Sequence, residues 1–290
     1  MTNKAKALIR LARPHHYIKN GLVFGPVFFA HRLTDPAAML SAGVGFVGFC
    51  LAASAVYVFN DMVDAGSDAV HPLRHKRPLA AAAVTFRSAG VFMLVLLGLA
   101  CLCCLWLGSA EYCLVLAGYV VLNVFYTLKL KRLPVVDALC VATGFLLRIF
   151  AGAVVIGVSV SPWLAGLTFT LALVLAFAKR RCDRDICRAA GGISTAVVYN
   201  QRFLTIMIIV PALVTMAGYI FYTLSPAVIR EHEAPRLYLT APWVALGLLR
   251  YLWIVFGRRR QCYPVEALLR DHWLQVVILG WVVGLWLVIY

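Results

Sequence analysis

Apolar residues in this 290-residue chain occur in long runs that are separated by short polar segments. A helix that crosses a membrane needs about 20 mostly apolar residues, because each residue adds only about 1.5 Å to its length. The pattern predicts nine such helices, of which the first is short and contains Pro26. The expected spans are 21–33, 38–59, 89–108, 112–129, 134–157, 162–178, 203–224, 239–256 and 273–290. We therefore expect an all-α, polytopic membrane protein with a single domain over 1–290.

The amino-acid composition agrees with this pattern. Hydrophobic residues make up 63% of the chain, whereas a soluble domain has about 45–50%. Charged residues make up only 13%, about half of the usual ~25%. The excess of apolar side chains indicates that most of the protein surface faces lipid.

The formal net charge of +15 is unevenly distributed among the loops. With nine spans and a cytoplasmic N-terminus, only three of the 27 Lys and Arg residues are on the outer side: Arg32, at the outer end of the first span, Arg230 and Arg236. Arg148 and Arg250 lie in the interior of spans, so the remaining 22 are on the cytoplasmic side. Cytoplasmic loops of membrane proteins accumulate Lys and Arg. The bias predicts a cytoplasmic N-terminus and accounts for the basic charge without a nucleic-acid partner.

An acidic segment, Asn60 to Asp68, directly follows the second predicted span. On a helix, Asp61, Asp64 and Asp68 fall within about 60° of one another. Three carboxylates on one face repel one another unless a cation lies between them. Mg²⁺ suits such a site, because it is commonly held by one or two carboxylates together with substrate phosphates. The alternative is a solvated helix end, although acidic residues at a helix C-terminus are unfavourable to the helix dipole.

A basic segment, His71 to Pro78, follows the acids and contains Arg74 and Arg77. The planar guanidinium group matches the geometry of phosphate oxygens. A metal ion together with arginines would suit a diphosphate leaving group. The alternative is ordinary anchoring of an internal loop by positive charge.

Ionisable residues also occur around and within the fifth predicted span. Tyr126, Lys131, Asp137 and Arg148 follow one another there, and Asp137 and Arg148 share a helix face about three turns apart. Ionisable residues inside a membrane are costly and usually functional. Asp137 and Arg148 are too far apart for a direct pair, so each needs another partner. Structural pairing between helices is the alternative.

Two further basic segments lie at predicted membrane boundaries. One contains Lys179, Arg180 and Asp183 at the end of the sixth span, and the other runs from Arg13 to Asn20 and includes Lys19. The second segment also fits an interfacial amphipathic helix with snorkelling bases. Patterns typical of serine hydrolases, zinc proteases and P-loop nucleotide-binding proteins are not found in the sequence.

The acidic N-D-x-x-D-x-x-x-D segment after the second span resembles that of the UbiA-type prenyltransferase superfamily. Other elements resemble its decaprenyl-phosphate phosphoribosyltransferase branch: R-P-x-x-x-x-K-N (Arg13 to Asn20), H-P-x-[RK]-x-x-R-P (His71 to Pro78) and K-R-x-x-[ED] (Lys179 to Asp183). So does Y-x-x-x-L-K-x-x-x-x-x-D, followed by an arginine eleven residues later. The resemblance implies a helical bundle with a cytoplasm-facing polar cavity in a bacterial inner membrane.

The resemblance also implies an activity: transfer of 5-phosphoribose from phosphoribosyl pyrophosphate to a polyprenyl phosphate, with Mg²⁺ and release of diphosphate, for arabinose-containing cell-envelope glycans. Asp61, Asp64 and Asp68 would bind the metal, and Asp61, Asp64, Asp137 and Tyr126 are the expected catalytic residues. The expected substrate-binding residues are Lys19, Asn60, Arg74, Arg77, Lys131, Arg148, Lys179, Arg180 and Asp183.

Two other functions remain open at this point. The first is a polyprenyl transferase acting on an aromatic acceptor such as 4-hydroxybenzoate, but the single acidic motif and the H-P-x-R element count against it. The second is a transporter for an anionic metabolite, for which inverted repeats would be expected. The sequence leaves open whether the chain forms a homo-oligomer.

Overall fold

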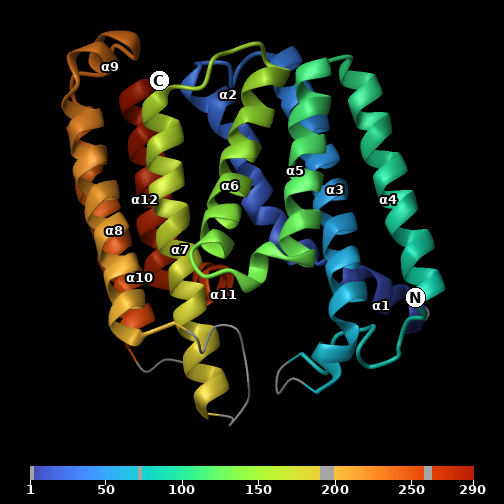
Figure 1. The fold of residues 1–290 in the computed structure, drawn as a ribbon. Helices are drawn as coiled ribbons and strands as arrows, with labels where there is room; N and C mark the ends of the chain where they lie inside the picture. The colour runs from blue at the N-terminus through green and yellow to red at the C-terminus, as the bar shows by residue number, and fades with distance from the viewer. Residues whose placement is uncertain (1–2, 71–73, 190–198, 258–262) are drawn as a thin grey trace. The chain divides into compact units, whose positions relative to one another are not determined.

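The computed structural model describes residues 3–70, 74–189, 199–257 and 263–290, and all regular elements in these ranges are helices. The chain divides into two compact units, Met1–Val160 and Ser161–Tyr290, which are described in turn. The single domain expected over 1–290 stays a prediction. Figure 1 shows the helices of both units.

The first unit contains six α-helices and two 3₁₀ segments within the part of the chain that is described. These are α1 (Asn3–Ala12), η1 (Pro14–Phe24), α2 (Gly25–Phe29), α3 (Pro36–Ala69), α4 (Phe86–Leu107), α5 (Ala110–Leu128), η2 (Leu130–Arg132) and α6 (Val136–Val155). The long helix α3 packs against α4, α5 and α6. Its start is fixed by Asp35, whose carboxylate accepts hydrogen bonds from the backbone N–H groups of Ala37 and Ala38.

The second unit is also helical throughout its described residues. It contains α7 (Pro162–Ala189), α8 (Gln201–Leu224), α9 (Pro226–Glu231), η4 (Leu237–Thr240), α10 (Ala241–Phe256), α11 (Pro264–Arg270) and α12 (His272–Ile289). Helix α7 packs along α8, and α10 packs against α12. A hydrogen-bonded chain joins three elements: Trp281 donates to the Tyr219 hydroxyl at 2.8 Å, and this hydroxyl lies 2.7 Å from the Thr240 hydroxyl.

Eight helices among the described residues are long and apolar enough to cross a membrane. They correspond to the second through ninth predicted spans, so the expected count of nine is not confirmed. The predicted first span, 21–33, consists instead of the end of η1 and the five-residue α2. Gly21, Gly25 and Pro26 interrupt the apolar run there, and glycine and proline disfavour a continuous α-helix.

The η1–α2 segment nevertheless runs antiparallel along α3. Tyr17 bonds Ser54 at 2.8 Å, Asn20 donates to Cys50 at 3.1 Å, and Phe24 packs on Phe46 with ring centroids 5.5 Å apart. Val27 then joins a buried cluster with Ala38 and Ala42 near the start of α3. A 3₁₀ segment rises about 2 Å per residue, so a segment shorter than a spanning α-helix follows the N-terminal half of α3.

Many large apolar side chains on the long helices are exposed, for example Leu105 on α4 at 77% and Leu114 on α5 at 72%. Such a surface would be unfavourable in water over several helices but suits the hydrocarbon core of a bilayer. Together with the eight apolar helices, this identifies a multi-pass membrane protein.

Candidate functional site

The C-terminal turns of α3 carry the acidic residues that the sequence singles out. Helix α3 continues to Ala69, ten residues beyond the predicted span of 38–59, so Asp61, Asp64 and Asp68 are all helical. Asp61 and Asp68 are buried, with 1% and 2% of their surfaces exposed. A buried carboxylate requires compensating charge or hydrogen bonds. The neighbouring cations provide this compensation.

Two arginines from different parts of the first unit meet Asp61. Arg13 Nη2 lies 2.5 Å from Asp61 Oδ1, and Arg77 Nη1 lies 3.1 Å from the same oxygen. The same Arg77 nitrogen lies 2.6 Å from Asp68 Oδ2, so Arg77 joins two carboxylates. The guanidinium of Arg13 also lies over the Tyr57 ring, 5.3 Å from its centroid. We call Asp61, Asp64, Asp68 and the cations that pair with them the ion-pair cluster.

Lys131 is the third cation of this cluster. Its Nζ lies 2.5 Å from Asp64 Oδ1, although the two residues are 67 positions apart in the chain. Thr127, one turn before η2, donates a 3.3 Å hydrogen bond to Asn60. The α5–α6 connection is thereby attached to the C-terminal part of α3. The structure thus brings together six of the predicted site residues: Asn60, Asp61, Asp64, Asp68, Arg77 and Lys131.

The other predicted residues of the basic segment are placed differently. Arg74 is half-buried, and its side chain forms no ion pair with the acids within the described residues. His71, Pro72 and Leu73 lie outside the described residues, as do Arg258, Arg259 and Arg260 of the last internal loop. Arg74 and Arg77, which the sequence treats as equivalent, are therefore not equivalent in the structure.

Arg13 belongs to the ion-pair cluster but is not among the site residues predicted from the sequence. Arg13 is the first residue of the R-P-x-x-x-x-K-N element, and that motif is the sequence signal that points to it. Burial lowers the pKa of the Arg13 guanidinium, while the adjacent Asp61 carboxylate opposes this shift. Arginine remains charged in proteins despite such shifts. Its backbone is in the left-handed region, with φ at 54°.

The cluster has an oxygen atom available for a metal ion. Asp61 Oδ2 is buried and has no hydrogen-bond partner in the described structure. However, no group of three His, Cys, Asp or Glu side chains there is arranged to hold a metal. Each of the three acids is paired with a cation of the chain instead, and the metal-binding role expected of them stays a prediction. One or two of these carboxylates, completed by phosphate oxygens, would still fit Mg²⁺.

Arg148 belongs to a second buried network in the first unit. Its Nε donates to Asn20 at 2.8 Å, Nη1 to the Gly144 carbonyl at 2.5 Å, and Nη2 to the Tyr119 hydroxyl at 3.2 Å. The guanidinium also stacks near the rings of Phe49 and Tyr119. These bonds link η1, α5 and α6, which agrees with the alternative of structural pairing between helices.

Three expected residues of this unit remain, and two of them lie close to helix ends. Asp137 is buried in the first turn of α6 and accepts a 2.7 Å hydrogen bond from the Ala138 N–H group. A carboxylate is favourable at a helix N-terminus. Tyr126 lies in the last turn of α5, and Lys19 lies within η1. The substrate-binding and catalytic roles expected of these residues stay predictions.

In the second unit, α7 extends eleven residues beyond the predicted span of 162–178 and carries Lys179, Arg180 and Asp183. Lys179 is exposed, whereas Asp183 is 5% exposed. Arg180 Nη1 lies 3.5 Å from Asp183 Oδ2, and Tyr263 donates a 2.8 Å hydrogen bond to Asp183 Oδ1. Tyr263 has no signal in the sequence, because it lies 80 residues from its partner.

Comparison with known proteins relates the sequence to one family. The family model described as the UbiA prenyltransferase family matches residues 22–269. The chain is 30% identical to the decaprenyl-phosphate phosphoribosyltransferase of Mycolicibacterium smegmatis, over 97% of this chain and 91% of that protein. It is 26% identical to the protein of the same name from Corynebacterium glutamicum, over 99% of this chain and 88% of that one.

Solved structures show the same fold. A UbiA homolog from Archaeoglobus fulgidus bound to GPP and Mg²⁺ aligns with a TM-score of 0.74 and 19% identity, covering 98% of this chain and 99% of that chain. The same homolog bound to DMAPP and Mg²⁺ aligns with a TM-score of 0.73. Proteins of this fold have therefore been observed with a divalent metal bound.

Proposed function

Because the chain belongs to the UbiA prenyltransferase family, we propose that it transfers 5-phosphoribose from phosphoribosyl pyrophosphate to a polyprenyl phosphate, with decaprenyl phosphate as the expected lipid. The observation that carries the proposal is similarity over nearly the whole chain to two bacterial proteins named for this reaction. The cation-rich surroundings of the α3 carboxylates are consistent with two anionic substrates.

In the proposed reaction, a phosphate oxygen of the lipid attacks the anomeric carbon of the ribose. A new carbon–oxygen bond forms as the bond from that carbon to the diphosphate breaks, and the diphosphate leaves with the electron pair. The second pKa of a phosphate monoester is about 6, so the attacking oxygen is already ionised at neutral pH. The protein therefore needs to position the substrates and stabilise the leaving group rather than supply a base.

Arg13 and Arg77 are suited to the leaving diphosphate. Both guanidinium groups lie on Asp61, and Arg77 also contacts Asp68. Arginines can form two parallel hydrogen bonds with phosphate oxygens as readily as with carboxylates. We infer that diphosphate takes over part of this pairing when it binds. The charges of Arg13 and Arg77 are then compensated by carboxylates before the substrate binds and partly by its diphosphate afterwards.

Mg²⁺ is the metal that we propose for this site. When bound, it supplies positive charge to the diphosphate as charge develops on the leaving oxygen. Asp61 and Asp64 are the residues that would hold it, with Asp68 nearby on the same helix face. The buried Asp61 Oδ2, which lacks a hydrogen-bond partner in the described structure, supports this assignment.

The other expected substrate-binding residues keep their proposed roles. Lys19 and Lys131 are candidates for either phosphate-bearing substrate, and Lys179 and Arg180 for the 5-phosphate of the donor. The bacterial inner membrane, with the N-terminus and the ion-pair cluster facing the cytoplasm, is the proposed location. That orientation would give a soluble phosphorylated donor access to the cluster.

The direct test uses purified protein in nanodiscs with ribose-labelled phosphoribosyl pyrophosphate, decaprenyl phosphate and Mg²⁺. The proposal expects label to move into the lipid fraction, with diphosphate released in equal amount. A parallel reaction contains a polyprenyl diphosphate and 4-hydroxybenzoate. Prenylation of the aromatic acid, without consumption of phosphoribosyl pyrophosphate, would replace the proposal with the aromatic prenyltransferase alternative.

A further inference from the structure

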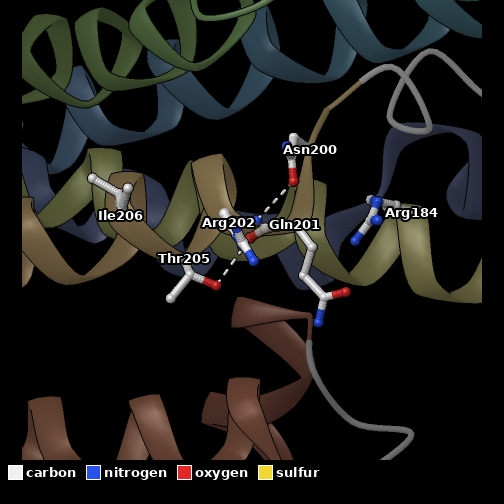
Figure 2. Close-up of a pocket in the computed structure, with 6 residues that line it drawn as sticks. All are labelled: Arg184, Asn200, Gln201, Arg202, Thr205 and Ile206. Atoms are coloured by element: carbon white, nitrogen blue, oxygen red, sulfur yellow. Dashed lines mark hydrogen bonds between the residues drawn. The ribbon is translucent and has the colours of Figure 1, made fainter.

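The second unit contains a pocket that the proposed reaction does not use. It has a volume of about 680 Å³. It is lined by Arg184 of α7, by Asn200, which precedes α8, and by residues in the first two turns of α8. The lining residues on that side are Asn200, Gln201, Arg202, Thr205 and Ile206 (Figure 2). Two arginines and a helix N-terminus therefore border one space.

Arg184 is the most informative residue of this pocket. Only 4% of its surface is exposed, yet its Nε and Nη1 atoms have no hydrogen-bond partner in the described part of the chain. The nearest acid is Asp185, whose Oδ1 lies 3.7 Å from Arg184 Nη1 and whose side chain is 55% exposed. A contact of this length with an exposed carboxylate compensates little of the cost of burying a guanidinium.

The start of α8 borders the same space and carries backbone N–H donors. Asn200 caps the helix by accepting a 3.0 Å hydrogen bond from the Arg202 N–H group. Gln201 and Phe203 occupy first-turn positions, whose N–H groups have no acceptor within the helix. Such helix starts attract anions, because the free N–H groups and the helix dipole carry partial positive charge.

The side chains around the pocket add further positive charge. Figure 2 shows Arg184 directed from α7 toward the first turn of α8, where Arg202 lies. Arg181 is attached to the same turn through a 3.1 Å hydrogen bond to the Thr205 hydroxyl. Asp185 is the acid within ion-pair distance of Arg184 in the described structure. The charged side chains among the described lining residues, Arg184 and Arg202, are both cationic, so the pocket is net positive.

We propose that this pocket binds a phosphate group through Arg184, Arg202 and the N-terminus of α8. A phosphate oxygen would compensate the buried guanidinium, and its tetrahedral set of oxygens suits both a planar arginine and helix N–H donors. The phosphate belongs either to a lipid headgroup or to a free phosphorylated compound. Exposed Ile206 at the rim would accommodate the apolar part of a lipid.

Binding to the purified full-length protein tests the proposal without measuring turnover. One arm titrates inorganic phosphate against protein in detergent and follows thermal unfolding, with chloride at matched ionic strength as reference. The other arm uses native mass spectrometry to compare phosphatidic acid with phosphatidylcholine. Saturable phosphate binding is expected in at least one arm. Binding in the first identifies a free phosphate ligand, and binding in the second alone identifies a lipid headgroup.

The variants assign this binding to the pocket. Arg184→Gln should weaken it about tenfold or more, as expected for loss of a charged hydrogen bond. Arg188→Gln is the matched control, because Arg188 is exposed one turn further along α7 and does not line the pocket. If Arg184→Gln does not fold, Arg202→Gln is measured instead and should weaken phosphate binding. Arg202 also lines the pocket but is exposed, so its substitution should not disturb folding.

Three results would overturn the proposal. The first is the absence of saturable phosphate binding in both arms. The second is equal weakening by Arg184→Gln and Arg188→Gln, which would indicate a general effect of charge. The third is binding that requires Arg77 but neither Arg184 nor Arg202, since the phosphate would then occupy the ion-pair cluster.

Discussion

Asp61 is the carboxylate around which the cluster is arranged. It is buried, and its Oδ1 atom forms ion pairs with Arg13 and Arg77. Its Oδ2 atom has no hydrogen-bond partner in the described structure. The distribution suggests that the two oxygens have separate tasks: one orders the arginines, and the other is available to a metal. A substitution that removes the charge but keeps the shape should therefore affect both tasks.

We predict that Asp61→Asn lowers the transfer rate by about two orders of magnitude or more, the usual scale for removing a preorganised electrostatic group from an active site. The measurement is the initial rate at saturating concentrations of both substrates. Glu266→Gln, which changes an exposed carboxylate on α11, serves as the control and should retain its rate. Full activity of Asp61→Asn, or of the native protein in excess EDTA, would contradict the metal assignment.

Arg77 depends on its shape as well as its charge, because Nη1 alone contacts both Asp61 and Asp68 and the other N–H groups of the guanidinium can bind the diphosphate. Lysine keeps the charge but cannot present a planar fork to two anionic groups. We predict that Arg77→Lys raises the KM for phosphoribosyl pyrophosphate by about tenfold, equivalent to losing one charged hydrogen bond. Arg74→Lys, which alters a residue without an ion pair to the described acids, should change that KM less. The reverse order would show that the wrong arginine has been assigned.

At the scale of elements, the close approach of α6 to η1 fixes the position of the Arg148 network. A Cβ atom added at Gly152 would lie 2.0 Å from the Val23 carbonyl oxygen, which no side chain can tolerate without movement of the backbone. Only glycine permits this contact. Arg148 and Asn20, one turn away on the two elements, are thereby brought within 2.8 Å.

We predict that Gly152→Ala destabilises the protein by about 1–3 kcal/mol, the usual cost of overpacking. Thermal unfolding in one detergent gives the measurement. Gly118→Ala is the matched control, because Gly118 is also inside a helix but a Cβ there meets nothing within 4 Å. That variant should be neutral or slightly more stable, since alanine favours the helix. Equal Tm values for the two variants would mean that η1 does not pack on α6 as described.

The extended C-terminal part of α7 carries the residues proposed for the 5-phosphate of the donor. We predict that Lys179→Ala or Arg180→Ala raises the KM for phosphoribosyl pyrophosphate by about one to two orders of magnitude, while the KM for the polyprenyl phosphate changes little. Two KM determinations on protein in nanodiscs provide the measurement. A selective rise in the lipid KM would show that the donor and acceptor assignments must be exchanged.

For the whole molecule, the distribution of Lys and Arg predicts which loops face the cytoplasm. In a protein whose native cysteines are replaced, we predict that His75→Cys reacts with an impermeant thiol reagent only from the cytoplasmic side. Glu231→Cys should react only from the outside. Both positions are exposed in the structure. The opposite labelling pattern would deprive a soluble donor of access to the ion-pair cluster and exclude the proposed orientation.

The sequence alone determined the helical class, the boundaries of the eight long apolar helices to within a few residues at most of their ends, and the position of the acidic residues on one helix face. These properties are local: a chain in lipid must satisfy its backbone hydrogen bonds within each segment, so a sustained apolar run specifies a helix. The short η1–α2 segment escaped this reasoning, because its stability comes from packing along α3 rather than from its own length.

Only the tertiary structure decided which side chains meet. Arg13 pairs with Asp61 across 48 positions, and Arg148 pairs with Asn20 across 128. Arg77 forms ion pairs with Asp61 and Asp68, whereas Arg74, three residues earlier, forms none with the acids of the cluster in the described structure. Charge patterns are repeated along the chain and therefore match many partners equally well. Helix packing removes that ambiguity, because only some pairs come within hydrogen-bond distance once the apolar faces are in contact.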